Sequence, residues 1–522
     1  MRPSTTGKTS HRTSVLVLVL CIAALMLMMG IPASASAHAA GTPAVANWGS
    51  HTIVVKPNGS NDTADLQAAF NTCTSHNWVC TIQLVKGTYY TDQVYAIGFQ
   101  GSFVGAGQGA TIIQGLPNLP SPGAAYNTSM SPFWAALPGP TNPWPDLFTF
   151  VNGAFRVSQM TLVDTYFNPV PNGWNYFGLA STYLWADIMV TGEQANAAFD
   201  HFAMITGPGE FNIGIGNPSS FNSAGGLVYE GMLLPSGWQP QGYPTAYTDQ
   251  IPVSGTFSVT NCYLYGTDSA VWVENTLDAS VTIGFNLITS SPSMISPIDL
   301  SNTQVWVYGN QLTNVMYGAG VIPFQSLFQY NLLPSTIYVM GNYVEVNWGG
   351  SGLFFSDYGP GEGLPSTLSV VAAGNTVVTD TSCGCYTIGY PVIWGWDLSS
   401  FVVSGNTVLS GGAGVEIANL PGNVGWVSGN TILGAMAGVL LGASTLIGSA
   451  FTGPVYGIHV TANVIKNSVD YGIAVVGGSS NNTVAFNLVK GSGLYDLYWD
   501  QTGTNDLWYG NIYATSSPAT LP

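Results

Sequence analysis

An asparagine that recurs at a nearly constant spacing is the feature that most constrains how this chain folds. The segments SGNTVLSGGAGVEI (404–417) and SGNTILGAMAGVLL (428–441) begin 24 residues apart and show the same order of residue types. A fixed period in this range is typical of a repeat protein, in which each unit stacks on its neighbours and longer units carry loops. The series has spacings of 24 or 25 residues, or of 31 to 33, and comprises Asn261, Asn286, Asn310, Asn342, Asn375, Asn406, Asn430, Asn463, Asn487 and Asn511.

Each repeat contains short runs of β-branched and aromatic residues that are typical of strands, such as SVTNCYLYG, AVWVEN and QVWVYGN. Three short strands in 24 residues leave no room for a helix, so we expect an all-β, single-domain parallel β-helix. Its rungs would stack at about 4.8 Å. The asparagine would lie at a sharp turn and hydrogen-bond to the asparagines above and below, which is a structural role.

The first 37 residues have the character of a secretory signal peptide. Basic residues precede the apolar run VLVLVLCIAALMLMMGI, and PASASA provides a cleavage point near Ala37. We therefore expect a secreted, extracellular protein that is not attached to a membrane after processing. The alternative is a retained membrane anchor, for which the apolar run is short.

The charge of the remaining chain restricts its partners. Residues 38–522 contain five lysines and arginines but all 25 aspartates and glutamates. Such a surface repels nucleic acid, anionic lipid and acidic polysaccharides. We expect no nucleic acid partner and favour a neutral polysaccharide or oligosaccharide; the oligomeric state stays open.

The cysteines predict one disulfide and no zinc site. Cys73 and Cys80 are close enough in sequence to form a disulfide in an oxidising exterior. Cys383 and Cys385 are candidates for a second, which would leave Cys262 as a small buried residue. We expect no cofactor and no metal, although acidic oxygen ligands leave calcium as a candidate.

The N-terminal part carries a resemblance to a known group of proteins. Asn61 and Asp62 predict the start of a short amphipathic helix that runs to about Thr72 and covers the first open rung. Together with VKGTYY and GQGATIIQG, this segment resembles the start of the pectin-lyase-like superfamily, whose members are right-handed parallel β-helices. The resemblance spans most of residues 50–512 and implies the fold, with its right-handed coil. It does not imply one activity, because the superfamily includes lyases, glycosidases, esterases, epimerases and non-catalytic proteins.

The sequence divides into six parts. They are the signal peptide (1–37), a leader (38–49), the cap and first rungs (50–115), rungs with long loop insertions rich in Pro, Gly and aromatic residues (116–250), regular rungs (251–512) and a C-terminal tail (513–522).

Carboxylates define the candidate site. In sugar-active proteins of the superfamily the groove lies along one sheet, whose strands here would read AGVEI, AGVLL and YGIAV. Alternation places Trp272 and Glu274 on the outer side of such a strand if Val271 and Val273 point inward. Asp299 would point outward in the same way. The candidate catalytic residues, at the strands that we align with this sheet, are Asp200, His201, Asp249, Asp268, Glu274 and Asp299, with Trp272 as a platform for a sugar ring.

Paired carboxyl groups are the groups that glycoside hydrolysis requires. The two groups are about 5–5.5 Å apart in retaining enzymes and about 6.5–9.5 Å apart in inverting enzymes. Side chains on neighbouring rungs offer both separations. The structural alternatives are that Asp268 stabilises a turn, that His201 is a turn residue and that Trp272 packs beneath a loop.

The motifs of the well-known pectin-degrading subfamilies are missing. The sequence contains no Asp-Asp, Gly-His-Gly or Arg-Ile-Lys of the polygalacturonases, and we find no pattern of a pectin methylesterase. Arg156 is the one arginine after residue 37, and the lysines lie far in sequence from the acidic rungs, which disfavours a polysaccharide lyase. We favour a secreted glycoside hydrolase that acts on a neutral or weakly charged polysaccharide. The alternative is a non-catalytic β-helix that binds glycan or serves as a structural protein at the cell surface.

Overall fold

The computed structural model describes residues 51–92, 94–116, 146–164, 184–192, 194–206, 223–230, 232–233, 250–251, 253–265, 269–289, 293–315, 317–320, 333–347, 350–357, 366–379, 391–420, 424–442 and 453–521. Contacts divide the chain into two units, Met1–Ala46 and Asn47–Pro522, and all described residues belong to the second. The expected signal peptide and the pair Cys383 and Cys385 lie outside the described residues.

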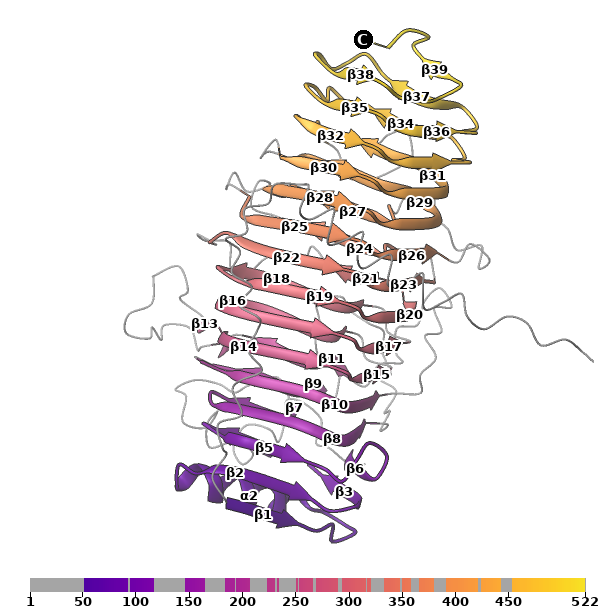
Figure 1. Cartoon of the computed structure of the whole chain (residues 1–522). Coiled ribbons are helices and arrows are strands. Elements are labelled where there is room, and N and C mark those ends of the chain that lie inside the picture. Colours follow the sequence, from indigo (N-terminus) through magenta and orange to yellow (C-terminus); the bar gives the residue numbers. More distant parts are fainter. Residues whose placement is uncertain are drawn as a thin grey trace, which may run out of the picture. The chain divides into compact units, whose positions relative to one another are not determined.

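The described strands form a parallel β-helix. Most strands pair in parallel with strands one turn earlier and one turn later, so that they stack one above another (Figure 1). Thr407 pairs with Thr431, for example, and Tyr263 with Leu287, in each case one repeat further along the chain. This parallel β-helix is the fold class that the sequence predicted.

The strands form three faces, which we call faces I, II and III. Face I contains β1 (His51–Val55), β2 (Val79–Leu84), β5 (Gln100–Val104), β14 (Val253–Thr260), β19 (Gln304–Tyr308), β22 (Ser335–Met340), β25 (Leu368–Ala373), β28 (Ser400–Ser404), β30 (Gly425–Ser428), β32 (Ile458–Thr461), β35 (Thr483–Ala485) and β38 (Leu507–Tyr509). Face II contains β3 (Gly87–Thr91), β6 (Thr111–Gly115), β15 (Tyr263–Tyr265), β17 (Leu287–Thr289), β20 (Gln311–Val315), β23 (Tyr343–Val346), β26 (Thr376–Thr379), β33 (Val464–Lys466) and β36 (Leu488–Lys490). Face III contains β4 (Val94–Ile97), β7 (Asp146–Val151), β9 (Leu184–Thr191), β11 (Ser223–Glu230), β18 (Ser293–Ser301), β21 (Tyr317–Gly320), β24 (Leu353–Ser356), β27 (Ile393–Trp396), β34 (Tyr471–Val475), β37 (Tyr495–Trp499) and β39 (Ser516–Ser517).

Five longer strands pass from one face to the next. They are β8 (Ala154–Asp164) and β10 (Asn196–Thr206), from face I to face II; β29 (Thr407–Ala418) and β31 (Thr431–Leu441), from face II to face III; and β16 (Ser269–Gly284), from face III to face I. A separate antiparallel pair is formed by β12 (Met232–Leu233) and β13 (Gln250–Ile251).

The interior is filled by side chains that alternate along each strand. Val, Ile and Leu occupy the inward positions of most rungs, as in Val403, Val427 and Val460 on consecutive strands of face I. Phenylalanines fill the interior near the N-terminal end, where Phe150 stacks on Phe155 with ring centroids 4.2 Å apart. Burial of this continuous apolar column is the main stabilising contribution.

Buried asparagines form a ladder at the turn between faces I and II. Asn430 is fully buried, and its backbone N–H and Nδ2 both donate to Oδ1 of Asn463 at 2.9 Å. Its Nδ2 also donates to the Val403 carbonyl at 3.0 Å. The same pattern links the asparagines from Asn286 to Asn511, as predicted for a structural role.

Asn261 does not belong to this ladder. The ladder position in its rung is occupied by Cys262, whose backbone N–H donates to Oδ1 of Asn286 at 2.9 Å. Asn261 precedes it and takes a left-handed backbone conformation, with φ of 55°. The spacing of 25 residues between Asn261 and Asn286 reflects this offset of one position.

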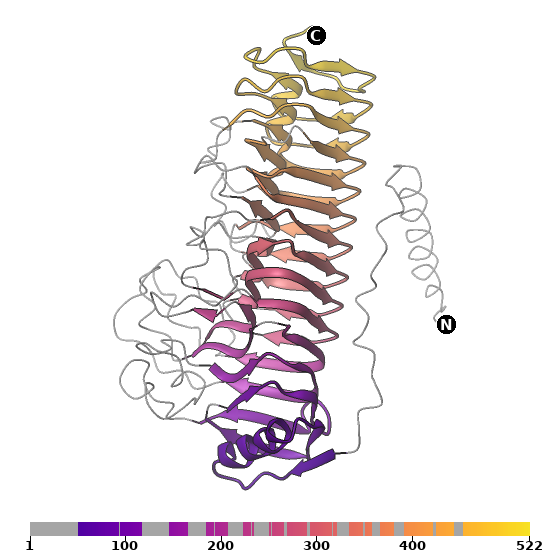
Figure 2. The ribbon, with the colours of Figure 1, turned by 90° about the vertical axis from the view of Figure 1, so that its left-hand side faces the viewer.

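The helix α2 (Thr63–Ser75) lies at the N-terminal end of the stack, beside β1 (Figure 2). Leu66, Ala69 and Phe70 are buried against the first rungs, so the helix covers the end of the core as expected. It ends at Ser75, slightly later than the sequence predicted. The carboxylate of Asp62 makes no capping bond; it accepts hydrogen bonds from the backbone of Asn58 at 2.7 Å and Tyr90 at 2.9 Å.

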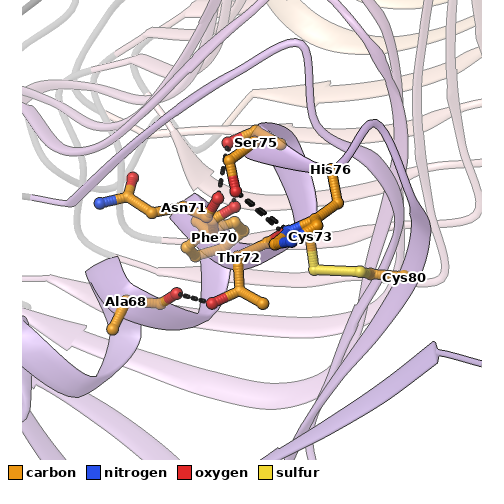
Figure 3. Close-up of a disulfide and its surroundings, with 9 residues drawn as sticks. Ala68, Phe70, Asn71, Thr72, Cys73, Ser75, His76 and Cys80 are labelled. Atoms are coloured by element: carbon orange, nitrogen blue, oxygen red, sulfur yellow. Dashed lines mark hydrogen bonds between the residues drawn. A yellow bond between two sulfur atoms is a disulfide. The ribbon is translucent and has the colours of Figure 1, made fainter.

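The predicted disulfide between Cys73 and Cys80 is present and joins the last turn of α2 to β2 (Figure 3). Replacing both cysteines by alanine should lower the free energy of unfolding by about 2 kcal/mol, because the bond closes a short loop. Urea denaturation with and without a reducing agent measures the effect. The reductant should destabilise the natural protein by about 2 kcal/mol more than it destabilises the double variant. An equal effect of the reductant on both proteins would contradict this.

Candidate functional site

One row of outward side chains crosses several rungs of face III. The register pairs Gly320 with Phe354, Phe354 with Trp394, and Trp394 with Glu416. Val415 and Ile417, on either side of Glu416, belong to the core, so Glu416 occupies the outer side of its strand. Aromatic and acidic side chains therefore follow each other on neighbouring strands.

The aromatic side chains of this row are in contact. The rings of Phe354 and Trp394 have centroids 4.1 Å apart, and Trp396 stacks on Trp394 at 6.4 Å. Trp394 is 1% exposed and Glu416 is fully buried. The outer side of face III is thus covered at these rungs.

Two aspartates follow directly after the neighbouring strands β24 and β27. The register pairs Ser356 with Trp396, which places Asp357 and Asp397 at the same position one rung apart. Oδ2 of Asp357 accepts hydrogen bonds from Ser366 Oγ at 3.0 Å and from the backbone N–H groups of Thr367 at 2.7 Å and Leu368 at 3.1 Å. Those three donors hold Asp357 in place.

The environment of Asp397 favours its protonated form. Burial raises the pKa of Asp397 to about 7, against the effect of the Asn419 amide that donates to its Oδ1. The negative charge of Asp357 raises this pKa further. A buried carboxyl next to a second carboxylate is an arrangement in which one group can act as an acid while the other is ionised.

Asp397 also has a structural role at the turn from face III to face I. It takes a left-handed conformation, with φ of 56°, and Asn419 of the next rung does the same, with φ of 48°. The same turn contains the hydrogen-bonded pairs Asp278–Asn302 and Asn481–Asn505, one rung apart. Asp278 is exposed, however, so burial distinguishes the carboxyl of Asp397 from that of Asp278.

Some of the predicted site residues lie on face III. Val271 and Val273 are fully buried, and Trp272, between them, is partly exposed on the outer side of β16. Trp272 pairs with Ser296 on β18. On the next strand Ile295 pairs with Ala319, so Ser296 aligns with Gly320, the first residue of the row described above. Trp272 therefore lies in the same row as Trp394. The backbones of Glu274 and Asp299 also lie on face III, and Glu274 pairs with Ile298, so the two are offset by one position.

The remaining predicted residues either lie outside the described residues or lie elsewhere on the β-helix. Asp268 and Asp249 lie outside the described residues, and β13, which follows Asp249, belongs to the separate antiparallel pair. Asp200 and His201 were expected on the same sheet as Glu274, and this placement is wrong. Asp200 ends the face I part of β10, and His201 occupies the turn to face II with φ of 50°.

Asp200 instead anchors a group of polar side chains at that turn. Its carboxylate accepts bonds from Arg156 and from Nδ2 of Asn261 at 3.0 Å, and His201 Nδ1 lies 2.9 Å from Oδ2. Burial raises the pKa of Asp200, but these hydrogen bonds and the charge of Arg156 outweigh burial, so the pKa lies below its ordinary value.

Asp357 and Asp397 are not among the site residues predicted from the sequence. The sequence pattern that could have identified them is an aspartate directly after a strand with aromatic residues, in LFFSD (353–357) and again in IWGWD (393–397). The two segments align one rung apart, but the stretch of chain between them is longer than the repeat and obscures the match.

No membrane-crossing helix and no metal-binding group stand out in the part of the chain that the structure describes. None of its helices is long and apolar enough to cross a membrane. Its His, Cys, Asp and Glu side chains form no cluster of three or more that could hold a metal ion.

Comparison with known proteins yields similarity of fold alone. No family model matches the chain, and no curated protein is similar to it in sequence. Among solved structures, the catalytic domain of a GH87 α-1,3-glucanase with nigerose is 13% identical over 88% of this chain and 68% of its own, with a TM-score of 0.40. An N-terminal fragment of bacteriophage phi29 gene product 12 is 11% identical over 86% and 69%, with a TM-score of 0.49. The A-module of a mannuronan C-5 epimerase from Azotobacter vinelandii is 12% identical over 89% and 97%, with a TM-score of 0.36.

Proposed function

We propose that this protein is a secreted, carbohydrate-active β-helix protein, a glycoside hydrolase that acts on a neutral or weakly charged polysaccharide. The observation that carries the proposal is the position of Asp357 and Asp397, one rung apart on face III, beside the aromatic side chains of Trp394 and Trp396. The structural neighbours include proteins whose names refer to polysaccharide chemistry, which agrees with a carbohydrate partner.

The proposed chemistry assigns a different role to each carboxyl. Asp397, with its pKa raised to about 7, would donate a proton to the glycosidic oxygen. Asp357 would act as the base or nucleophile. Neighbouring rungs are about 4.8 Å apart, a backbone spacing close to the separation of about 5–5.5 Å in retaining enzymes.

The distribution of basic residues supports hydrolysis over elimination. A polysaccharide lyase needs a base and a cationic group for the uronate carboxylate, usually Arg or Lys. The five lysines and arginines after residue 37 all lie outside the strands of face III. Acidic substrates would also be repelled by the excess of negative charge.

The burial of the carboxyls favours a second candidate function. Asp397 and Glu416 are fully buried, so a sugar reaches them only after the covering groups move. If face III does not open, the protein is a non-catalytic β-helix that binds glycan on its exposed surfaces.

Product analysis separates the candidates. The secreted protein is incubated with neutral and acidic polysaccharides, and reducing ends and unsaturated products are measured. A hydrolase releases reducing ends without unsaturation, and Asp357→Asn and Asp397→Asn should each lower the rate at least about a hundredfold. Asp278→Asn, an aspartate at the same turn as Asp397, should leave the rate unchanged. Unsaturated products, or full activity in both face III variants, would contradict the proposal, and absence of all products would favour the non-catalytic candidate.

A further inference from the structure

The turn between faces I and II carries a second group of exposed side chains, separate from face III. One position of this turn is left-handed in every rung from Gln159 onward. In six later rungs it is glycine, at Gly309, Gly341, Gly374, Gly405, Gly429 and Gly510. Three consecutive earlier rungs carry His201, Asn261 and Phe285 at this position instead, with φ of 50°, 55° and 57°.

The earlier rungs of this group carry polar side chains. Arg156 and His201 both contact the carboxylate of Asp200, and their side chains are 47% and 56% exposed. Asn261 donates to the same carboxylate and is exposed as well. The Asp200 carboxylate therefore contacts three exposed side chains, those of Arg156, His201 and Asn261.

The later rungs of this group carry aromatic side chains. Phe285 is 61% exposed, and its ring lies across Gly309 of the next rung, where an added Cβ would be 2.8 Å from the ring. The ring of Tyr308 lies across Gly284 in the opposite direction, and the two rings meet edge to face, with centroids 5.2 Å apart. Phenylalanine is an unfavourable residue at positive φ, whereas glycine has no such cost.

The aromatic contact also stabilises the turn. Phe486, with φ of 58°, meets Tyr509 in the same way, with centroids 5.3 Å apart, in a rung far from Asp200. The neighbours of Phe486 at the turn position are Ala462 and Gly510, so neither adjacent rung carries a polar side chain at this position. Phe285 is therefore distinguished by the polar side chains on the two rungs before it.

We propose that Arg156, Asp200, His201, Asn261, Phe285 and Tyr308 form a glycan-binding strip for a neutral polysaccharide. The polar groups would hydrogen-bond to sugar hydroxyls, and Phe285 and Tyr308 would pack against the apolar face of a pyranose ring. Rungs about 4.8 Å apart present these groups at a spacing similar to that of successive sugar units. An acidic polysaccharide fits less well, because Asp200 already neutralises Arg156 and the chain carries a large negative excess.

The strip rests on the proposed carbohydrate partner, but not on catalysis at face III. Its test is binding to a soluble mixed-linkage β-glucan, a galactomannan and a xyloglucan, measured by affinity electrophoresis and calorimetry. Polygalacturonate serves as the acidic comparison. The natural protein should bind at least one neutral polymer and bind polygalacturonate more weakly.

Two matched variants separate binding from folding. Phe285→Gly places at this turn the residue found in six later rungs, so the protein should fold, and binding should weaken at least about tenfold because a large apolar contact is lost. Phe486→Gly removes the equivalent ring from a rung without the polar group and should leave binding unchanged. His201→Asn, which introduces the residue of the next rung, should weaken binding while the melting temperature stays constant.

Three results would contradict the proposal that this strip binds glycan. They are the absence of binding to all three neutral polymers, an equal loss of affinity in Phe285→Gly and Phe486→Gly, and tighter binding to polygalacturonate. Loss of hydrolysis in Asp397→Asn with retained binding would support both sites. Absence of hydrolysis with binding that depends on Phe285 would reject the proposed enzyme and retain the strip.

Discussion

Replacing Asp397 by asparagine should make the protein more stable at pH 8 by up to about 4 kcal/mol and leave its stability at pH 4 nearly unchanged. The pKa of Asp397 is about 7 in the folded protein, against an ordinary value of 3.8. Between these values the folded state binds a proton that the unfolded state has released, so the stability of the natural protein falls as the pH rises from about 4 to about 7. Asparagine keeps the acceptor for Asn419 and cannot ionise.

Urea denaturation at several pH values measures this difference. Asp278→Asn is the control, because Asp278 is exposed at the equivalent turn and also bonds to the asparagine of the next rung. Its substitution should change the stability by less than about 0.5 kcal/mol at every pH. Parallel pH profiles for Asp397→Asn and the natural protein would show that the carboxyl is not held protonated.

Replacing Asn430 by alanine should lower the free energy of unfolding by about 4 kcal/mol. The substitution removes two bonds that Asn430 Nδ2 donates, to Asn463 and Val403, and two bonds that its Oδ1 accepts from Asn406. The former partners stay buried with no water to replace the lost groups, and each hydrogen bond contributes about 1 kcal/mol. Since a rung is stabilised only by its neighbours, the loss should extend to both adjacent rungs.

Chemical denaturation and hydrogen exchange measure this effect and its extent. The control is Asn71→Ala, which removes one exposed bond from Gln67 on helix α2 and should change stability by no more than about 0.5 kcal/mol. If Asn430→Ala costs no more than Asn71→Ala, the ladder is not a source of stability.

The fold was predictable because one interaction repeats. The asparagine ladder imposes the same residue at the same turn, and the period is visible even where loops lengthen a rung. The position of Asn261 was not predictable, because asparagine suits both the ladder and the left-handed position before it. Only the backbone shows that Cys262 occupies the ladder position in that rung.

The candidate site was predictable in part. Trp272 was correctly assigned to the outer side of its strand, because alternation with Val271 and Val273 is a local property. Asp200 was assigned to the wrong face, because the long stretch of chain that separates it from Thr260, its partner in register, contains an insertion that hides the period. The protonation of Asp397 depends on burial and on the carboxylate of Asp357 in the preceding rung, which no local pattern shows.

The ladder has a further consequence for the evolution of this chain. Each ladder asparagine from Asn310 to Asn487 gives the same two donors to the next rung and receives the same two from the rung before, so the junctions between these rungs are interchangeable. A gain or loss of one complete 24-residue unit, such as that between Asn406 and Asn430, preserves every junction, whereas a change of one residue breaks two of them. The length of this protein is therefore free to change in whole units, and the number of side chains displayed on each face changes with it.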